Sequence, residues 1–354
     1  MNFVVYVWAF FLFNLVIVIH ELGHFLTARA FGVNVIEFAI GMGPKFLKIS
    51  KGGTLFSLRC IPIGGFCAME GEEGKAGTAS SFNSKELWKR VIVLVAGGFM
   101  NLVLGFVFAV IVSCARPIAE PTVAQFDSGS VSSETGLRVG DEIRSINGYR
   151  VYLGRDLSFA LRLNESEEYT VEIMRDGIPI TLKNVKFTTI SGSDAKQHAV
   201  IDFRVNAAKK NLVNVLNYSA LQIASLIKMT LLSIYGLITG KFTLKDMAGP
   251  VGMVAQVGEL AMSGLKEGFN EALISMLLYM QMFTVSIGMF NLLPFPALDG
   301  GRIVFLAAEK IYGKPFKEGV EEIYHTIGFA LLMLLMVAIT YNDVIRIAGA
   351  WFRR

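Results

Sequence analysis

Charged residues are scarce in this chain of 354 residues, since Asp, Glu, Lys and Arg make up only 18% of it. Soluble domains carry about 25%, so the deficit argues against a protein that is soluble throughout. The net charge of +4 is small, and no basic run with interleaved aromatic residues is present, so nucleic acid is not an expected partner. Apolar residues reach 53%, which predicts a membrane protein with some soluble mass attached.

Cysteine is also rare. Cys60, Cys67 and Cys114 show no CxxC or ligand spacing, and their odd number argues against a disulfide framework. We expect all three to be buried thiols.

Four runs have the length and apolarity of membrane helices, namely 3–19, 91–115, 272–298 and 326–342. The first could alternatively be a cleaved signal peptide, because "TARA" at 27–30 resembles a cleavage site. However, no Lys or Arg precedes the run, and its 17 uncharged residues exceed a usual signal-peptide core. We therefore interpret it as a membrane helix.

A fifth apolar run, 211–240, carries Lys228 near its centre. A charged residue is costly inside a bilayer, so we expect an amphipathic helix on the membrane surface instead.

Basic residues set the expected orientation, because cytoplasmic loops are enriched in Lys and Arg. The residues that carry this argument between the first two runs are Arg29, Lys45, Lys48, Lys51, Arg59, Lys85, Lys89 and Arg90. That loop is therefore expected in the cytoplasm, and the segment after the second span outside it. The terminal "WFRR" opposes this rule for the last span.

The segment 117–206 differs from the rest of the chain in its sequence pattern. Short alternating runs such as "YTVEIMRD" and "HAVIDFRV" are separated by Gly, Asp and Asn, which predicts a small β-rich module. Its stretch "GLRVGDEIRSINGYRV" resembles the fingerprint of a PDZ domain, a family that binds extended peptide ends at a sheet edge.

Between the first two spans, 33–71 is rich in glycine and too apolar for a solvated loop. The Lys-Gly-Gly-Thr turn at 51–54 separates two strand-like runs. Non-helical backbone at membrane depth is tolerated only against protein or a water-filled cavity. We therefore expect a re-entrant β element.

His20, Glu21 and His24 form an H-E-x-x-H pattern at the end of the first apolar run. Residues four apart lie on one helix face, so the two imidazoles can share a metal while Glu21 serves as general base. The alternative is a pair of satisfied polar residues at a helix end, but ionisable groups at membrane depth are rarely without function. His198 and His325 are expected to be surface or capping residues.

Catalytic zinc needs a third protein ligand, and Asp299 in "NLLPFPALDGG" is the candidate. Three spans bring it to the same side of the membrane as His24. The alternative is that Asp299 caps the following helix, although glycine pairs are poor helix starters.

Together these motifs resemble the site-2 proteases, zinc metalloproteases that cut within membranes, of the bacterial type with one PDZ domain. Every fixed position of the family's second motif is matched, by Asn291, Pro294, Pro296, Leu298, Asp299, Gly300 and Gly301. The resemblance implies one Zn²⁺ held by His20, His24 and Asp299, with Glu21 as catalytic acid and base. It also implies that Asn291, Gly65, Phe66 and Met69 bind substrate.

The expected fold is a polytopic α-helical membrane protein with four transmembrane helices, a membrane re-entrant β element and an inserted extracytoplasmic β-rich PDZ domain. Its expected parts are a first span (1–30), the re-entrant β region (31–87), a second span (88–115), the PDZ domain (117–206), a membrane-surface region (207–270), a third span (271–298), a cytoplasmic-side segment (299–325) and a fourth span (326–349).

The expected function is intramembrane cleavage of single-span membrane proteins in the bacterial inner membrane, such as anti-sigma factors or signal-peptide remnants. An upstream site-1 protease would make the first, external cut. A non-catalytic scaffold whose PDZ domain captures exported peptide ends is the main alternative, but it has no need of Glu21. A transporter predicts internal repeats, which the sequence does not show.

Overall fold

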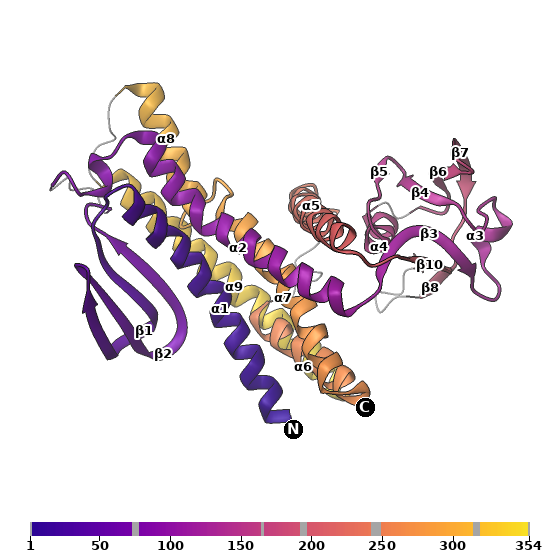
Figure 1. Ribbon diagram of the computed structural model, residues 1–354, viewed down its shortest axis with the longest axis horizontal. Coiled ribbons are helices and arrows are strands. Elements are labelled where there is room, and N and C mark those ends of the chain that lie inside the picture. Colours follow the sequence, from indigo (N-terminus) through magenta and orange to yellow (C-terminus); the bar gives the residue numbers. More distant parts are fainter. Residues whose placement is uncertain are drawn as a thin grey trace. The chain divides into compact units, whose positions relative to one another are not determined.

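The computed structural model describes residues 2–72, 78–163, 166–191, 197–241, 249–313 and 319–352. The chain forms two compact units. Unit 1 comprises Met1–Phe108 and Thr230–Arg354, and unit 2 is Ala109–Met229 (Figure 1).

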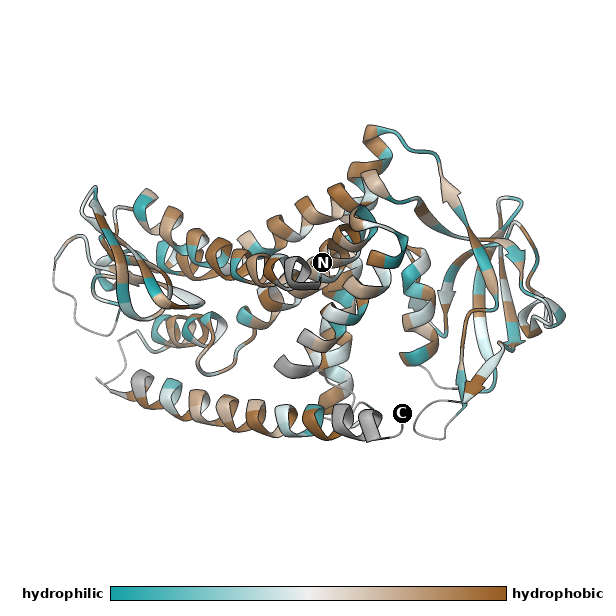
Figure 2. Ribbon diagram, turned by 90° about the horizontal axis from the view of Figure 1, so that it is seen from below, coloured by the Kyte–Doolittle hydropathy of each residue, from teal (hydrophilic) through white to brown (hydrophobic). Residues whose placement is uncertain are grey.

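Long helices dominate unit 1. They are α1 (Asn2–Ala30), α2 (Leu87–Ala115, which continues into unit 2), α6 (Pro250–Glu267), α7 (Phe269–Asn291), α8 (Asp299–Tyr312) and α9 (Val320–Phe352), with a short 3₁₀ turn at Phe82–Ser84. Hydrophobic residues cover much of these helices (Figure 2).

Within the described residues, five helices are long and apolar enough to cross a membrane. They are Val7–Ala30, Leu87–Ala115, Leu212–Ile238, Phe269–Asn291 and Ile323–Ile345. Four of them coincide with the four expected spans. The fifth, α5 (Leu212–Ile238), is the run expected on the membrane surface, and its placement stays a prediction because length and composition alone do not decide it.

The third expected span is shorter than predicted. Helix α7 ends at Asn291 rather than near Leu298, and its C-cap is Leu292. Pro294 and Pro296 follow, and proline cannot continue a helical hydrogen-bond ladder. Residues 292–298 therefore form an irregular connection that ends where α8 begins.

Small residues let the helices of unit 1 approach closely. A Cβ added at Gly23 of α1 would lie 2.3 Å from the carbonyl oxygen of Ala96 in α2. One added at Gly98 of α2 would lie 2.8 Å from the carbonyl oxygen of Gly288 in α7. Glycine at such crossings is typical of helices that pack within membranes. These contacts fix α2 between α1 and α7.

Two strands of unit 1, β1 (Val35–Lys51) and β2 (Thr54–Met69), form the expected hairpin, with Lys51 paired to Thr54 across the Gly-Gly turn. The hairpin folds over on itself. Residues 35–40 of β1 pair with 65–69 on one side, and 37–40 pair with 55–58 on the other. Residues 47–51 pair with 54–58. The resulting sheet has 65–69 as one edge and 47–51 as the other.

Unit 2 contains the predicted β-rich module. In its described part, a sheet of six strands has the order β10-β3-β4-β6-β7, with β5 paired to β4. The strands are β3 (Ile118–Phe126), β4 (Glu142–Ile146), β5 (Tyr149–Arg150), β6 (Tyr169–Arg175), β7 (Ile178–Val185) and β10 (Phe203–Ala208). The remaining elements are α3 (Val131–Glu134), α4 (Gly154–Leu163), β8 (Thr189–Ser191) and β9 (Gln197–Ala199).

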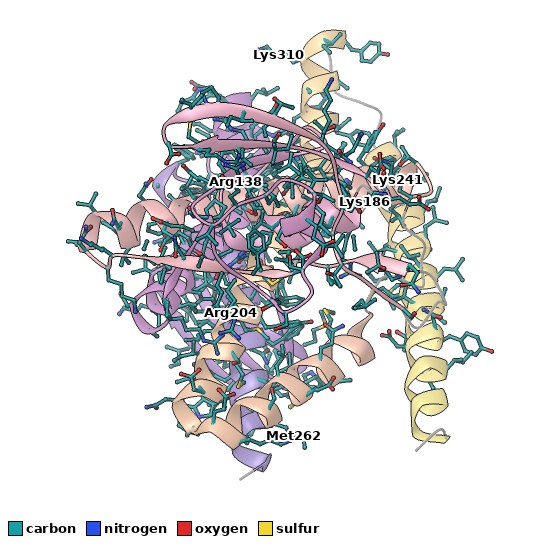
Figure 3. All side chains as sticks on the ribbon, turned by 90° about the vertical axis from the view of Figure 1, so that its right-hand side faces the viewer. Arg138, Lys186, Arg204, Lys241, Met262 and Lys310 are labelled. Atoms are coloured by element: carbon teal, nitrogen blue, oxygen red, sulfur yellow. The ribbon has the colours of Figure 1, made fainter. Side chains whose placement is uncertain are left out.

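The Asn-Gly turn between β4 and β5 forms as the sequence predicts. Asn147 and Gly148 both have positive φ, 46° and 77°, and Ile146 pairs with Tyr149. This is the geometry of a two-residue hairpin turn. Arg138, Lys186 and Arg204 of the module, which are labelled in Figure 3, are exposed.

Helix α5 contacts the module through polar side chains. Arg155 Nη2 donates a hydrogen bond to Gln222 Oε1 (2.8 Å), and the Ser225 hydroxyl donates to the Asp156 carboxylate. Lys228 Nζ donates to the carbonyl oxygen of Arg150 (2.6 Å). The polar face of α5 therefore faces protein.

The opposite face of α5 is apolar and exposed. Its exposed large residues are Leu212, Val213, Leu216, Leu231, Tyr235 and Ile238. This inverts the pattern of a helix in a soluble protein, which buries its apolar stripe.

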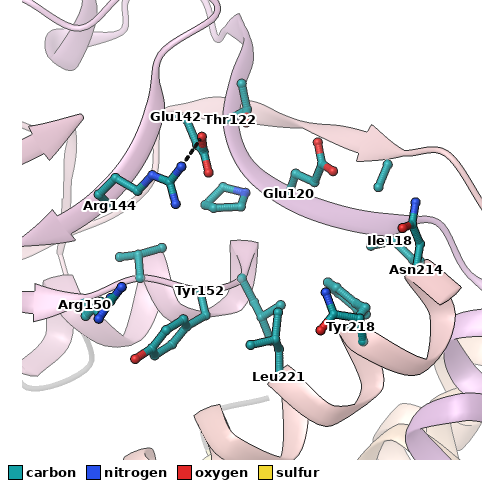
Figure 4. Close-up of a pocket in the computed structure, with 15 residues that line it drawn as sticks. Ile118, Glu120, Thr122, Glu142, Arg144, Arg150, Tyr152, Asn214, Tyr218 and Leu221 are labelled. Carbon is teal, nitrogen blue, oxygen red and sulfur yellow. Dashed lines mark hydrogen bonds and ion pairs between the residues drawn. The ribbon is translucent and has the colours of Figure 1, made fainter. Parts of the chain in front are cut away.

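A cavity of about 420 Å³ lies in unit 2, between the module and the first turns of α5. Glu120, Tyr152 and Tyr218 contribute to its lining, and Arg144 Nη2 forms an ion pair with Glu142 Oε2 (2.8 Å) at its wall (Figure 4). None of its lining residues belongs to the H-E-x-x-H or L-D-G-G motifs.

The expectation for the cysteines was wrong in part. All three are free thiols in the described residues, but only Cys67 is buried, while Cys60 and Cys114 are exposed. Cys60 lies on the β hairpin and Cys114 at the end of α2, where fewer neighbours cover the side chain.

Candidate active site

The H-E-x-x-H residues lie on one face of α1, well inside the helix. His20 and His24 are buried, with 8% and 6% of their surface exposed. Their Nε2 atoms are 3.2 Å apart, and the ring centroids are 4.8 Å apart. The four-residue spacing thus directs both imidazoles to the same point, as a shared ligand requires.

Asp299, the first residue of α8, reaches the same point. Its Oδ2 atom lies 3.2 Å from His20 Nε2 and 3.3 Å from His24 Nε2. The N-cap of α8 is Leu298, and no side-chain cap hydrogen bond is formed. The carboxylate therefore faces the histidines, and the alternative capping role of Asp299 is not seen.

The connection before Asp299 is held in a tight shape. Ala297 adopts a positive φ of 69°, and its N–H donates to His325 Nδ1 of α9 (2.9 Å). A Cβ at Gly300 would lie 2.1 Å from the carbonyl oxygen of Leu293, and one at Gly301 would lie 2.3 Å from that of Phe295. The glycine pair is needed because α8 starts directly against the connection. His325, expected to be a surface or capping residue, instead holds this connection.

A stripe of α2 lines the site opposite α1. Val93, Gly97 and Asn101 are spaced by four residues and so share a helix face. His24 Nδ1 lies 2.8 Å from the Val93 carbonyl oxygen. A Cβ at Gly97 would lie only 2.3 Å from His24 Nε2, so any larger residue there would displace the imidazoles. Sequence reasoning missed this stripe; its only local signal is a lone asparagine within an uncharged run.

Glu21 lies beside the edge of the β sheet. The Cys67 backbone N–H donates a hydrogen bond to its carboxylate. A Cβ at Gly65 would lie 3.6 Å from Glu21 Cγ. The edge segment 65–69 therefore approaches the acidic side chain that neighbours the two histidines.

The other residues expected to bind substrate have different surroundings. The Arg59 guanidinium lies 4.7 Å from the ring centroid of Phe66. Met69 is 6% exposed and packs in a hydrophobic cluster with Val35 and Phe38, so its side chain supports the sheet. Asn291 is the last residue of α7 and is partly exposed.

The donor set fits a metal ion. One atom from each of His20, His24 and Asp299 lies within 4.8 Å of the other two. Two imidazoles and a carboxylate form a ligand set of the kind that catalytic zinc uses, and they leave a position open for water. The Nδ1 contact to Val93 leaves the Nε2 lone pair of His24 available to a metal.

Comparison with known proteins decides the family. The family model for peptidase family M50 matches residues 8–335. The chain belongs to peptidase family M50. This confirms the resemblance to the site-2 proteases and makes the protein a zinc metalloprotease with membrane-length helices.

Relatives of the M50 protease match it along nearly its whole length. A protein of Clostridium acetobutylicum whose name describes it as a zinc metalloprotease is 35% identical over 345 residues, 98% of each chain. The regulator of sigma-W protease RasP of Bacillus subtilis is 28% identical over 420 residues, 95% of this chain and 97% of the relative. The family match and the name of the Clostridium relative indicate Zn²⁺ as the cofactor.

Proposed function

We propose that this M50 protease hydrolyses peptide bonds inside the membrane, within the transmembrane segments of single-span proteins. The position of His20 and Asp299 carries the proposal. His20 lies 13 residues after Val7 and 10 before Ala30, the bounds of the first membrane-length helix. At about 1.5 Å per residue, the metal-ligand group is roughly 15–20 Å from either end of that helix.

In this proposal His20, His24 and Asp299 hold the zinc ion, and Glu21 is the catalytic acid and base. Zinc bound there would supply a Lewis acid that activates water and polarises the scissile carbonyl. Glu21 takes the proton from the attacking water and later gives it to the leaving amine. His20 and His24 are buried, so bulk water has little access to the reacting groups.

The edge segment 65–69 is proposed to hold the substrate. A peptide bond within a helix is shielded, so the substrate must be extended before attack, and lipid cannot satisfy the exposed backbone groups. A sheet edge supplies those partners by strand addition. Gly65 lies next to Glu21, and Phe66 follows it along the edge. Asn291, at the end of α7, would bind substrate backbone from the other side, while Met69 contributes packing.

The protease is proposed to lie in the bacterial inner membrane with the metal site toward the cytoplasm. The basic residues between α1 and α2 support this orientation. The module at 117–206 would then be extracytoplasmic, and its "GLRVGDEIRSING" stretch supports its assignment as a PDZ domain.

The contacts of α5 support its placement on the membrane surface. Hydrogen bonds to the module occur along it up to Lys228. Beyond Lys228 only ten residues remain before the helix ends at Ile238, about 15 Å, which is half of a bilayer core. The apolar outer face of α5 suits contact with lipid.

The substrate class is proposed from the relatives and the site. RasP is named as a regulator of sigma-W, which supports membrane-held anti-sigma factors as substrates here, with signal-peptide remnants as a second group. A prior cut outside the membrane, by a site-1 protease, would shorten them first.

Reconstitution tests this proposal. The purified protein in lipid vesicles should cleave a single-span reporter within its apolar segment, as located by mass spectrometry of the products. Cleavage confined to the reporter's soluble part would contradict intramembrane proteolysis.

A further inference from the structure

Asn101 of α2 faces the Nδ1 atom of His20. Its Nδ2 atom lies 3.5 Å from His20 Nδ1. The residue is fully buried, and its Oδ1 atom has no hydrogen-bond partner among the described residues. A buried amide with one unpaired polar atom costs on the order of 1–3 kcal/mol, so a residue of this kind beside His20 needs a reason.

The two histidines are supported in parallel ways by α2. His24 Nδ1 meets the carbonyl oxygen of Val93, and His20 Nδ1 meets the amide of Asn101 two turns further along. Gly97 lies between them and leaves room for both rings. A metal-ligand imidazole almost always donates its second N–H to an oxygen, which fixes the ring and leaves the other nitrogen for the metal. Val93 supplies that oxygen to His24.

With Nδ2 toward the ring, Asn101 could only donate to His20 Nδ1. The proton of the neutral imidazole would then be on Nε2, the atom that faces Asp299, and Nε2 could not bind a metal. Rotating the amide by 180° exchanges Nδ2 and Oδ1 without moving the rest of the side chain. Oδ1 then accepts the Nδ1–H of His20, and the Nε2 lone pair becomes available.

We propose that Asn101 is the positioning residue for His20: its amide oxygen accepts the Nδ1–H of His20 and so prepares Nε2 for zinc. The inference rests on the proposed metal site. It gives both histidines the same arrangement, in which an oxygen of α2 accepts the Nδ1–H and the Nε2 lone pair is left for the metal. Thr284 Oγ1 donates to the backbone oxygen of Asn101 (3.1 Å), which steadies the helix at this turn without touching the side-chain amide.

The test is zinc affinity of the purified full-length protein, measured by competition with a chelator. Asn101→Leu keeps a similar size and removes the acceptor, and we expect its affinity to fall about 10- to 100-fold. Asn101→Asp keeps an acceptor oxygen and should bind within a few-fold of wild type. Thr284→Val is the matched control, since it changes packing at the same turn but leaves the amide, and its affinity should be unchanged.

A spectroscopic measurement separates positioning from packing. In the Co²⁺-substituted protein, Asn101→Leu should shift the visible absorption bands, while Asn101→Asp and Thr284→Val should retain the wild-type shape. Wild-type affinity and spectrum in Asn101→Leu would overturn the proposal. Equal losses in the leucine and aspartate variants would also overturn it and leave a packing role.

Two further measurements address a variant that does not fold and a failure of the proposed metal site. If Asn101→Leu does not fold, ¹⁵N-histidine spectra of the zinc-loaded wild type must show protonated Nδ1 on His20, assigned with the His20→Ala variant; protonated Nε2 would refute the arrangement. His24→Ala reports on the proposed site itself. Full zinc content in His24→Ala would reject that site, whereas zinc loss there with wild-type affinity in Asn101→Leu would reject only the role of Asn101.

Discussion

His20 Nε2 lies 3.2 Å from Asp299 Oδ2, although the two residues belong to the first helix and to α8 near the far end of the chain. Two polar groups so close inside an apolar bundle are expected to share a cation. We predict that Asp299→Ala and His24→Ala each lose most of the bound zinc, measured by metal analysis of purified protein. Asp343→Asn alters a buried carboxylate elsewhere on α9 and should keep its zinc. Full zinc content in Asp299→Ala would remove Asp299 from the ligand set.

Glu21→Gln should keep zinc and fold normally but lose about 10²- to 10⁴-fold in cleavage rate, because an amide cannot take the proton of the attacking water. The Cys67 N–H still finds an acceptor in the glutamine carbonyl, so the sheet edge should stay in place. Reporter cleavage and zinc content are measured on the same preparation. Turnover within a few-fold of wild type would assign the base to another group.

Helix α5 should not cross the bilayer. Single cysteines at Asn211 and Gly240, in a background that lacks the native cysteines, should both react with an impermeant thiol reagent from the outer side. Labelling from opposite sides would make α5 a span. Gln222→Leu and Ser225→Leu remove two of its polar contacts with the module, those to Arg155 and Asp156. They should loosen α5, which would appear as faster hydrogen exchange around Gly154–Leu163.

The module is expected to limit substrate size rather than to take part in the chemistry. Reporters with bulky external domains should be poor substrates, and already shortened ones good. Because α5 is bonded to the module, the clean deletion is 117–238 replaced by a flexible linker. It should keep zinc and cleave both reporters similarly. Equal loss of activity toward both, with zinc retained, would instead show that the module is needed structurally.

Asp202 should make the module sensitive to acid. Burial favours its neutral form, but Ser132 and Thr188 donate hydrogen bonds to the carboxylate and hold its pKa below the usual range. A lowered pKa in the folded state contributes stability that is present above the unfolded value of about 3.9 and is lost as pH falls through the folded value.

Asp202→Asn should therefore destabilise the module by about 1–3 kcal/mol at neutral pH, and the difference from wild type should shrink below about pH 4. Hydrogen exchange of module peptides in the full-length protein measures this. Asp127→Asn, at an exposed carboxylate nearby, is the control and should have little effect. A difference that is the same at pH 7 and pH 3.5 would disprove the linkage.

Local patterns predicted the parts of the site that depend on helical spacing. The four-residue interval of His20 and His24 determines that they share a face. The third span, in contrast, was expected to run through Pro294 and Pro296 to Leu298, and α7 ends earlier, at Asn291. The turns at Gly52 and Gly148 follow from residues that tolerate positive φ. These features depend on near neighbours in the chain, so the sequence expresses them directly.

Features that depend on packing between distant segments could not be predicted in the same way. Gly97 and Asn101 belong to an apolar run, and only the register of α2 against α1 reveals that they face the histidines. Helix α6 lies in the expected membrane-surface region (207–270), and only the packing shows that its Val257 and Ala261 contact Leu12 of α1 and Met276 of α7. The ring of His325 reaches the Asp299 connection only through the packing of α9.

The sheet edge at 65–69 has a consequence for the selection of substrates. An edge strand offers amide and carbonyl groups at a regular repeat, and these are the same for every sequence that pairs with it. Pairing with this edge therefore depends on whether a substrate segment can become extended, and not on which side chains it carries. Substrates of this protease should therefore share no consensus sequence around the scissile bond. Their transmembrane helices should be of low stability, with Gly, Pro or Asn near the scissile bond. Selectivity would then reflect how readily the helix of each substrate unwinds.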